Sequence, residues 1–254
     1  MKKETVGYIV LITLALSAII GIFFSPPIRQ DEDYHHFSDK DTLLGIPNFL
    51  NVISNLPFLI VGTLGVLKLK HLKKFHTQYG LFFLGICFVA GGSAYYHLNP
   101  TTETLVWDRL PMSLAFMALF SLIISEFIHE KTGKLLLAPL LLLGILSIAV
   151  WIIFNDLRFY ALVQFYPMLA IPAILIYFKS DNTTSKAYWL LLLAYIIAKL
   201  MEHFDQEVYT LLKVLSGHSL KHITAAIGVC AISRNMLKQT PGALKPVTGS
   251  SLKL

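Results

Sequence analysis

Charged residues and cysteine are both scarce in this sequence. Only 14% of the 254 residues are charged, whereas a soluble domain of ordinary composition carries about 25%. The two cysteines both fall inside apolar segments, so the sequence indicates neither a disulfide framework nor a cysteine-based metal site. Hydrophobic residues make up 55% of the chain. This composition indicates a membrane protein rather than a globular enzyme with an anchor.

Long apolar runs account for the low charge. Several reach the roughly 20 residues that a helix needs to cross a hydrocarbon core. Asn155, Asp156 and Arg158 interrupt the stretch 134–178 and predict a helical hairpin there. The sequence therefore predicts an all-α polytopic transmembrane helical bundle, with spans at about residues 6–25, 47–69, 79–98, 106–128, 134–154, 158–178, 186–203 and 217–237.

Lysines and arginines fall mainly on one side of these spans. If the N-terminus is cytoplasmic, most of the 21 basic residues lie at the inner face, as the positive-inside rule requires. The net charge of +6 then needs no nucleic-acid partner, because lysines beside anionic membrane lipids explain it. A lysine-rich chain of this kind is typical of a bacterial inner (plasma) membrane, and we expect both termini in the cytoplasm.

The two ends of the chain are expected to differ from its middle. Lys2 and Lys3 precede an apolar segment that is longer than the core of a signal peptide, and no small-residue cleavage site follows before Ser25. We therefore expect residues 1–29 to form an uncleaved signal-anchor helix, although a cleaved signal peptide is the alternative. Residues 30–237 are expected to form the helical core, and residues 238–254 a disordered cytoplasmic tail.

Polar residues gather at the predicted outer ends of three helices. Ser93 and His97 end one helix, Asp108 opens the next, and His218 and His222 open the last. Residues four apart share one face of a helix, and ionisable residues in membrane helices usually face a bundle interior or a wet cavity. Three imidazoles with an open position are the ligand set of a catalytic zinc ion. We therefore predict that His97, His218 and His222 bind zinc (Zn2+).

The same cluster predicts hydrolytic chemistry at the membrane surface. Zinc lowers the pKa of a bound water to about 7 and so supplies hydroxide at neutral pH. Asp108 is a candidate general base for that water, and Ser93 could donate a hydrogen bond to the attacked carbonyl. The plainer alternative is that these histidines are interfacial residues, since a single histidine at a membrane boundary is usually not a ligand. His35, His36, His71, His76, His129 and His203 are expected to be loop or helix-end residues, with His203 weighed as a partner of the site.

Four motifs follow one another in the order of a known family. They are an asparagine-and-serine motif, Ser-x-x-x-His, Asp-x-Leu-Pro-Met and His-x-x-x-His, and together with their surroundings they cover about residues 30–237. In these motifs the sequence resembles the alkaline ceramidase family of the CREST superfamily, which also contains adiponectin-type receptors. The matching residues are Asn48, Asn51, Ser54, Asn55, Ser93, His97, Asp108, Leu110, Pro111, Met112, His218 and His222.

The resemblance implies a fold and a reaction. It implies a seven-helix ceramidase-like core, so that the first span is one extra N-terminal helix. It also implies a hydrolase that acts on carbon–nitrogen bonds other than peptide bonds in linear amides. The substrate is then the N-acyl amide of ceramide or a ceramide-like lipid, and the residues assigned are the zinc ligands His97, His218 and His222 with Asp108 and Ser93.

Two properties of the family, its calcium site and its exact substrate, are not assigned to this chain. The eukaryotic enzymes have a calcium (Ca2+) site that ends in a glutamate ahead of the asparagine motif, and Asn48 stands at that position here. The carboxylates of the loop could bind calcium, but they show no ligand register, and a solvated loop is favoured; they are Asp31, Glu32, Asp33, Asp39 and Asp41. The lipid substrate also stays open, because many bacteria make no ceramide and another lipid amide could take its place.

Two other functions compete with hydrolysis. A seven-helix receptor or sensor could keep the same three histidines around a structural zinc. Asp108 and Ser93 favour the hydrolase, since a structural zinc needs neither a base nor an oxyanion donor. A transporter is the third alternative, and it predicts broken helices and charges near the membrane midplane, whereas the polar residues of this chain gather at one face.

Overall fold

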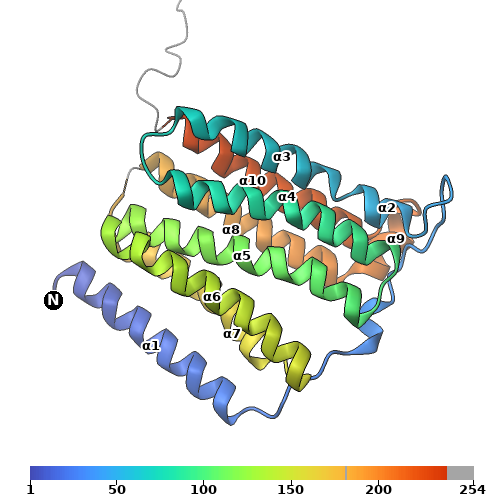
Figure 1. Cartoon of the computed structure of the whole chain (residues 1–254), viewed down its shortest axis with the longest axis horizontal. Coiled ribbons are helices and arrows are strands. Elements are labelled where there is room, and N and C mark those ends of the chain that lie inside the picture. Colours follow the sequence, from blue (N-terminus) through green and yellow to red (C-terminus); the bar gives the residue numbers. More distant parts are fainter. Residues whose placement is uncertain (181, 239–254) are drawn as a thin grey trace, which may run out of the picture.

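Long apolar helices, packed side by side, form the bundle that the sequence predicts (Figure 1). The computed structural model describes residues 1–180 and 182–238, so the predicted tail lies outside the described residues from position 239 onward. Six spans are long and apolar enough to cross a membrane: α1 (Lys3–Phe24), the run Phe49–His71, α4 (His76–Leu98), α5 (Thr102–Phe127), α6 (Glu130–Phe154) and α7 (Arg158–Tyr177). The all-α polytopic fold is confirmed.

The last two predicted spans differ from simple membrane crossings. α8 (Asn182–His203) is followed at once by the short helix α9 (Asp205–Leu212), and the pair bends by 79°. α10 (Gly217–Lys238) packs against α3 (Leu56–Lys68) and α8. Within the described residues α10 is not among the helices that meet the length and composition test for a span. The described part therefore has up to seven apolar spans, and α10 is an eighth long helix.

Local breaks in the helices follow from the sequence. The predicted hairpin is confirmed, because α6 ends at Phe154 and Asn155 turns the chain in the left-handed region. Asp156 then accepts hydrogen bonds from the backbone and side chain of Arg158 at the start of α7. The predicted span 47–69 is interrupted near Ser54, so that a one-turn helix, α2 (Phe49–Ile53), precedes α3, which ends in the 3-10 turn η2 (Leu69–His71).

The N-terminal helix lies at the edge of the bundle, where it packs against α7 (Figure 1). A Cβ atom at Gly7 would come within 2.7 Å of the Phe178 ring, so the glycine allows α1 to approach closely. The opposite face of α1 exposes Ile12, Ile19 and Phe23, as a lipid-facing helix does. The division into an anchor and a core stays a prediction.

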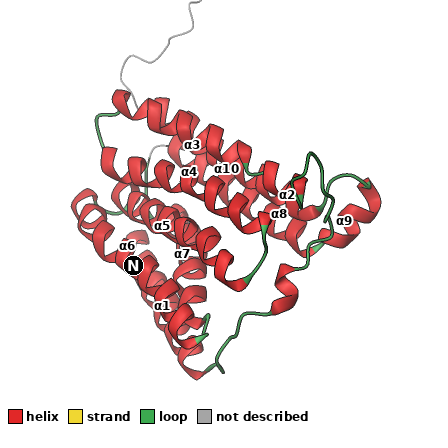
Figure 2. Cartoon of the chain, turned by 45° about the vertical axis from the view of Figure 1, so that its right-hand side comes forward, coloured by secondary structure: helices red, strands yellow, loops and turns green. Residues whose placement is uncertain are grey.

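The start of α1 and the end of α10 lie at one end of the bundle, and α2 and α9 lie at the other end (Figures 1 and 2). The end with α2 and α9 also carries the loop 26–46, in which Glu32–His35 forms the 3-10 turn η1. Both the His97 end of α4 and the first turn of α10 are found there. The predicted site residues therefore lie at the end of the bundle opposite the start of α1 and the end of α10.

A close approach between α4 and α5 sets the position of two of those residues. Pro111 has no N–H to give to the carbonyl of Trp107 four residues earlier, and that carbonyl faces Gly92 of α4. A Cβ atom at Gly92 would lie 2.0 Å from the Trp107 oxygen. Only glycine therefore allows the backbones to meet here, and Ser93 comes next to Asp108 as a result.

Replacement of this glycine tests the contact. We expect Gly92→Ala to destabilise the protein by about 1–3 kcal/mol, because the helices must move apart. The neighbouring substitution Gly91→Ala is the matched control, since a Cβ atom there meets no other atom within 4 Å and alanine favours the helix. The measurement is the thermal unfolding midpoint of each variant in the same detergent. Equal midpoints for the two variants would contradict the close-packing argument.

Candidate metal centre

The three predicted metal ligands meet in space although they are far apart in the sequence. One possible ligand atom from each of His97, His218 and His222 lies within 4.8 Å of the others, and all three side chains are buried. His97 comes from the last turn of α4, and His218 and His222 come from the first two turns of α10. Histidine, cysteine and carboxylate side chains are the usual metal ligands, and among the described residues these three histidines form a group that could hold a metal ion.

The spacing of the donor atoms suits zinc. The Nε2 atoms of His97 and His218 are 3.3 Å apart. Two nitrogen ligands at 2.0–2.1 Å on a tetrahedral zinc ion are also about 3.3 Å apart. The donor set of three imidazoles, held at this separation in a buried place, therefore fits a zinc ion with one position left open.

A chain of hydrogen bonds fixes the orientation of His222. Its Nδ1 atom is 2.8 Å from the Ser54 hydroxyl, which is itself 3.0 Å from the backbone oxygen of Asn51. The hydroxyl has one proton, and the Asn51 oxygen can only accept, so His222 Nδ1–H donates to Ser54. The other ring nitrogen of His222, Nε2, is then left with a free lone pair. This is the tautomer that a metal ligand needs.

The first turn of α10 is tied to the surrounding elements. Ser216 caps the helix by accepting a hydrogen bond from the Ser219 backbone, and both hydroxyls donate to the Asn51 side chain. The Asp205 carboxylate accepts from the His218 backbone N–H at 2.6 Å and from the Ser38 backbone N–H at 2.9 Å. A carboxylate at a helix N-terminus is favourable because of the helix dipole. These contacts hold His218 at a fixed position.

His218 also meets a cation within its own helix. The ammonium group of Lys221 lies 3.1 Å from His218 Nε2 and 2.8 Å from the Glu202 carboxylate on α8. An ammonium group can only donate, so His218 Nε2 presents its lone pair. The ring nitrogen that faces the cluster thus accepts a hydrogen bond from a cation.

The ring of His97 has fewer polar contacts. Its backbone oxygen accepts a hydrogen bond from the Asn48 side chain at 2.9 Å, but its buried Nδ1 atom has no hydrogen-bond partner among the described residues. Packing holds the ring instead, because Phe37 lies with its centroid 4.7 Å from His97 and 4.5 Å from His218. Sequence reasoning missed Phe37, which sits in the loop 26–46 and forms an apolar cover over two of the three histidines.

The loop 26–46 is only partly the solvated segment that its composition suggests. His35 is buried and lies 2.8 Å from the Tyr96 hydroxyl and 3.1 Å from the Thr102 hydroxyl, and this burial lowers the pKa of His35. His203, which was weighed as a partner of the site, is instead exposed at the end of α8.

The acidic residues of the loop do not gather into a ligand group in the described structure. Asp31 caps η1, and Glu32 and Asp33 pair with neighbouring histidines. Asp39 is buried, which raises the pKa of its carboxyl, and it accepts a hydrogen bond from the backbone of Asp41. The expectation that these residues form no calcium site stays a prediction.

Asp108 and Ser93 lie together beside the histidine cluster. Ser93 is buried on α4, and its hydroxyl is within hydrogen-bonding reach of the Asp108 carboxylate on α5. Thr101 caps α5 in a reciprocal pair with Thr104, so the helix begins two turns before Asp108. Both residues line the same cavity as His222. The five predicted residues therefore occupy one region of the bundle.

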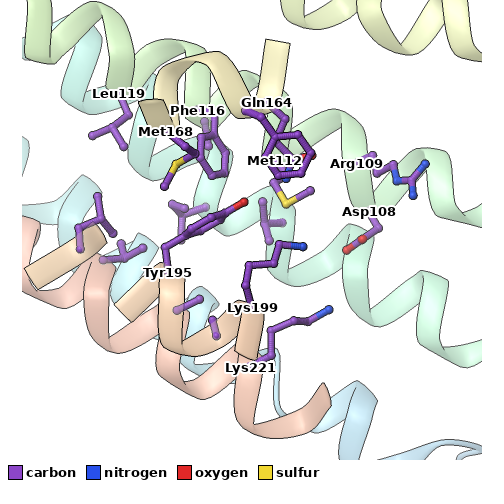
Figure 3. A pocket seen from close by; sticks show the side chains of 18 of the residues that line it. Asp108, Arg109, Met112, Phe116, Leu119, Gln164, Met168, Tyr195, Lys199 and Lys221 are labelled. Atoms are coloured by element: carbon purple, nitrogen blue, oxygen red, sulfur yellow. The ribbon is translucent and has the colours of Figure 1, made fainter. Parts of the chain in front are cut away.

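The cavity that contains these residues is apolar along most of its length. Its volume is about 450 Å³, within the range of small-molecule sites. α4, α5, α7, α8 and α10 contribute its walls, and its apolar part includes Phe82, Ile86, Leu119, Ile123, Ile171 and Val229. Four charged residues line its polar end, and Figure 3 shows Lys199 and Lys221 on one side of Asp108 and Arg109 on the other. The cavity can therefore hold an apolar chain with its polar group near the histidines.

Comparison with protein families gives a match over most of the chain. The family model described as Ceramidase matches residues 43–237, which include α2, all four sequence motifs and the three clustered histidines. No curated protein matches the chain.

Removal of two of the histidines tests the metal centre. We expect wild-type protein purified without chelator to contain about one zinc ion per chain, and the double variant His218→Ala/His222→Ala to lose it, because one imidazole cannot hold the ion alone. His203→Ala is the control, since this exposed histidine lies outside the cluster. Elemental analysis gives the zinc content. Equal zinc in the double variant and the wild type would contradict the ligand assignment.

Loss of the Ser54 hydroxyl tests the hydrogen-bond chain behind His222. We expect Ser54→Ala to weaken zinc binding about 10–100-fold, because the imidazole loses the partner that fixes its tautomer. Ser147→Ala is the matched control: this buried serine on α6 also donates to a backbone carbonyl. Competition with a zinc chelator measures the affinity. Unchanged affinity in Ser54→Ala would mean that Ser54 does not orient the ligand.

Proposed function

The chain belongs to the ceramidase family, and from this membership we propose that it is an integral-membrane, zinc-dependent amidase. Family membership supports a hydrolase that acts on amide bonds. The finer proposal is that the protein cleaves the N-acyl amide of ceramide or a ceramide-like lipid. Water adds across the C–N bond, so that the acyl carbon gains the hydroxyl and the amine gains a proton.

The three histidines are the proposed metal ligands. Their buried position, the 3.3 Å between two Nε2 atoms and the hydrogen bond that sets the tautomer of His222 support this role. A zinc ion bound there would act as a Lewis acid and lower the pKa of water to about 7.

Asp108 and Ser93 have separate proposed roles. Asp108 lines the same cavity as His222, and its carboxylate is proposed to take a proton from water at the histidine cluster. Ser93, within reach of that carboxylate, positions it and has a hydroxyl that can donate to the amide oxygen. A structural metal site needs neither group, and this favours hydrolysis over a receptor function.

The main support for the proposal is the position of the histidine cluster at the polar end of the cavity. An apolar cavity of about 450 Å³ ends at His222, Asp108 and Ser93. A lipid amide has the same division, with an apolar chain joined to a polar group at the scissile bond. Its chain can occupy the apolar part while its carbonyl meets the polar end.

The membrane orientation is part of the proposal. The beginning of α1 and the end of α10 share one end of the bundle (Figure 1), and the bias of lysines predicts that this end is cytoplasmic. The histidine cluster then faces the periplasmic or extracellular side of the inner membrane. Residues 1–29 serve as the signal anchor in this proposal.

Replacement of the proposed base tests the mechanism. We expect Asp108→Asn to keep its zinc but to lose hydrolysis of long-chain ceramide by about 10²–10⁴-fold, because the amide cannot accept the proton. Asp156→Asn is the matched control, since that aspartate lies in the α6–α7 turn and pairs with Arg158. Release of fatty acid is measured on protein of known zinc content. Retention of wild-type activity in Asp108→Asn would remove the general-base assignment.

A further inference from the structure

The polar end of the cavity contains more positive than negative side chains. Arg109, Lys199 and Lys221 line it together with two carboxylates, Asp108 and Glu202. Figure 3 shows Lys199 and Lys221 extending from α8 and α10 toward the side where Asp108 and Arg109 lie on α5. The headgroup of ceramide has hydroxyl groups only and would balance none of this charge.

Arg109 is the most unusual of these residues. Only 7% of its surface is exposed, and its guanidinium lies 4.6 Å from the ring centre of Trp151 and 5.0 Å from that of Tyr160. Tyr34 from the loop 26–46 lies at 5.3 Å. These aromatic rings stabilise a cation through its face, but a ring face is no acceptor for the N–H groups along the edge of the guanidinium.

One nitrogen of the guanidinium has no acceptor in the described part of the chain. The buried Nη1 atom of Arg109 has no hydrogen-bond partner there, and the neighbouring Asp108 makes no ion pair with it. Burial of a charged group is costly unless it is paired. Guanidinium groups present a planar set of donors that matches a carboxylate or a phosphate. The cavity therefore holds a buried guanidinium group with an unpartnered nitrogen.

The two lysines share one carboxylate. Glu202 is paired with Lys199 and, at 2.8 Å, with Lys221. One carboxylate balances one of the two ammonium charges, and Lys199 keeps 44% of its side chain exposed. With Arg109 and Asp108 counted as well, these five groups leave one excess positive charge at this end of the cavity.

We propose that the polar end of the cavity is a subsite for an anionic headgroup, so that the preferred substrate is a long-chain N-acyl amide whose amine part bears a carboxylate or a phosphate. Arg109 binds the anion, and Lys199 and Lys221 attract it. This inference rests on the proposed amidase function and specifies its substrate class. The reaction stays hydrolysis: the C–N bond breaks, the acyl carbon takes the hydroxyl of water, and the anionic amine takes the proton.

Matched synthetic amides test the subsite. N-palmitoylglycine and N-palmitoylethanolamine share their acyl chain and amide and differ in a carboxylate against a hydroxymethyl group. The phosphate ester of the second compound, N-palmitoyl-phosphoethanolamine, provides the phosphate arm and separates the two anion sources. We expect kcat/KM of the wild type to be about 10-fold or more higher for at least one anionic amide than for the neutral one, as charge-assisted hydrogen bonds imply.

Variants then connect the preference to the residues. We expect the ratio of anionic to neutral kcat/KM to fall about 10-fold in Arg109→Gln and by less in Lys199→Gln, a part-exposed position that tolerates substitution. A purely structural role of Arg109 would lower both rates and leave the ratio unchanged. Arg158→Gln is the matched control, since Arg158 pairs with Asp156 in the α6–α7 turn. If Arg109→Gln does not fold, Lys199→Gln alone must lower the ratio.

The outcomes separate this inference from the amidase proposal. Equal kcat/KM for neutral and anionic amides, or a preference that survives in every folded subsite variant, overturns the subsite. If zinc-loaded protein hydrolyses none of the amides, the amidase proposal fails instead. Binding of the same amides to detergent-solubilised protein then tests the subsite: tighter binding of an anionic amide that Arg109→Gln or Lys199→Gln abolishes supports it, and equal binding overturns it.

Discussion

The polar contacts of Asn51 hold the site end of the bundle together. Its side-chain oxygen accepts hydrogen bonds from Ser216 and Ser219 at the start of α10, and its side-chain nitrogen donates to the backbone of Asp39. Its backbone oxygen accepts from Ser54, the partner of His222. Inside a membrane bundle such groups have no water to replace a missing partner. One asparagine therefore joins α2, the loop 26–46 and α10, and with them one of the clustered histidines.

The bundle separates two environments along a single cavity. Its apolar part is walled by side chains such as Ile123 and Val229, and its polar end contains His222, Asp108 and the cations. Close backbone contacts hold the helices together at the polar end. Gly92 allows α4 to contact α5, and at Gly217 a Cβ atom would lie 2.1 Å from the Met201 oxygen of α8. Small residues at these points bring polar side chains of neighbouring helices within reach of one another.

The sequence was sufficient for the long helices and for the position of the cluster. Apolar runs of membrane length identify spans, and counting spans placed His97, Asp108 and His218 at one end. What it did not predict depends on contacts between distant residues. The interruption at Ser54, the short helix α9, the cover formed by Phe37 and the aromatic surroundings of Arg109 have no periodic signal. Arg109 can be read from the sequence as the residue after Asp108. Its contacts with aromatic rings become visible only in the folded chain.

The contact between Lys221 and His218 bears on how the protein is assembled. The ammonium group donates to the same imidazole lone pair that a metal ion would take. Small zinc domains are unfolded without their ion because nothing else satisfies the ligands. Here the first turn of α10 is tied to α8 within the bundle, because Lys221 joins the His218 ring to the Glu202 carboxylate. The histidine ligands are therefore brought together by the packing and ion pairs of the bundle itself.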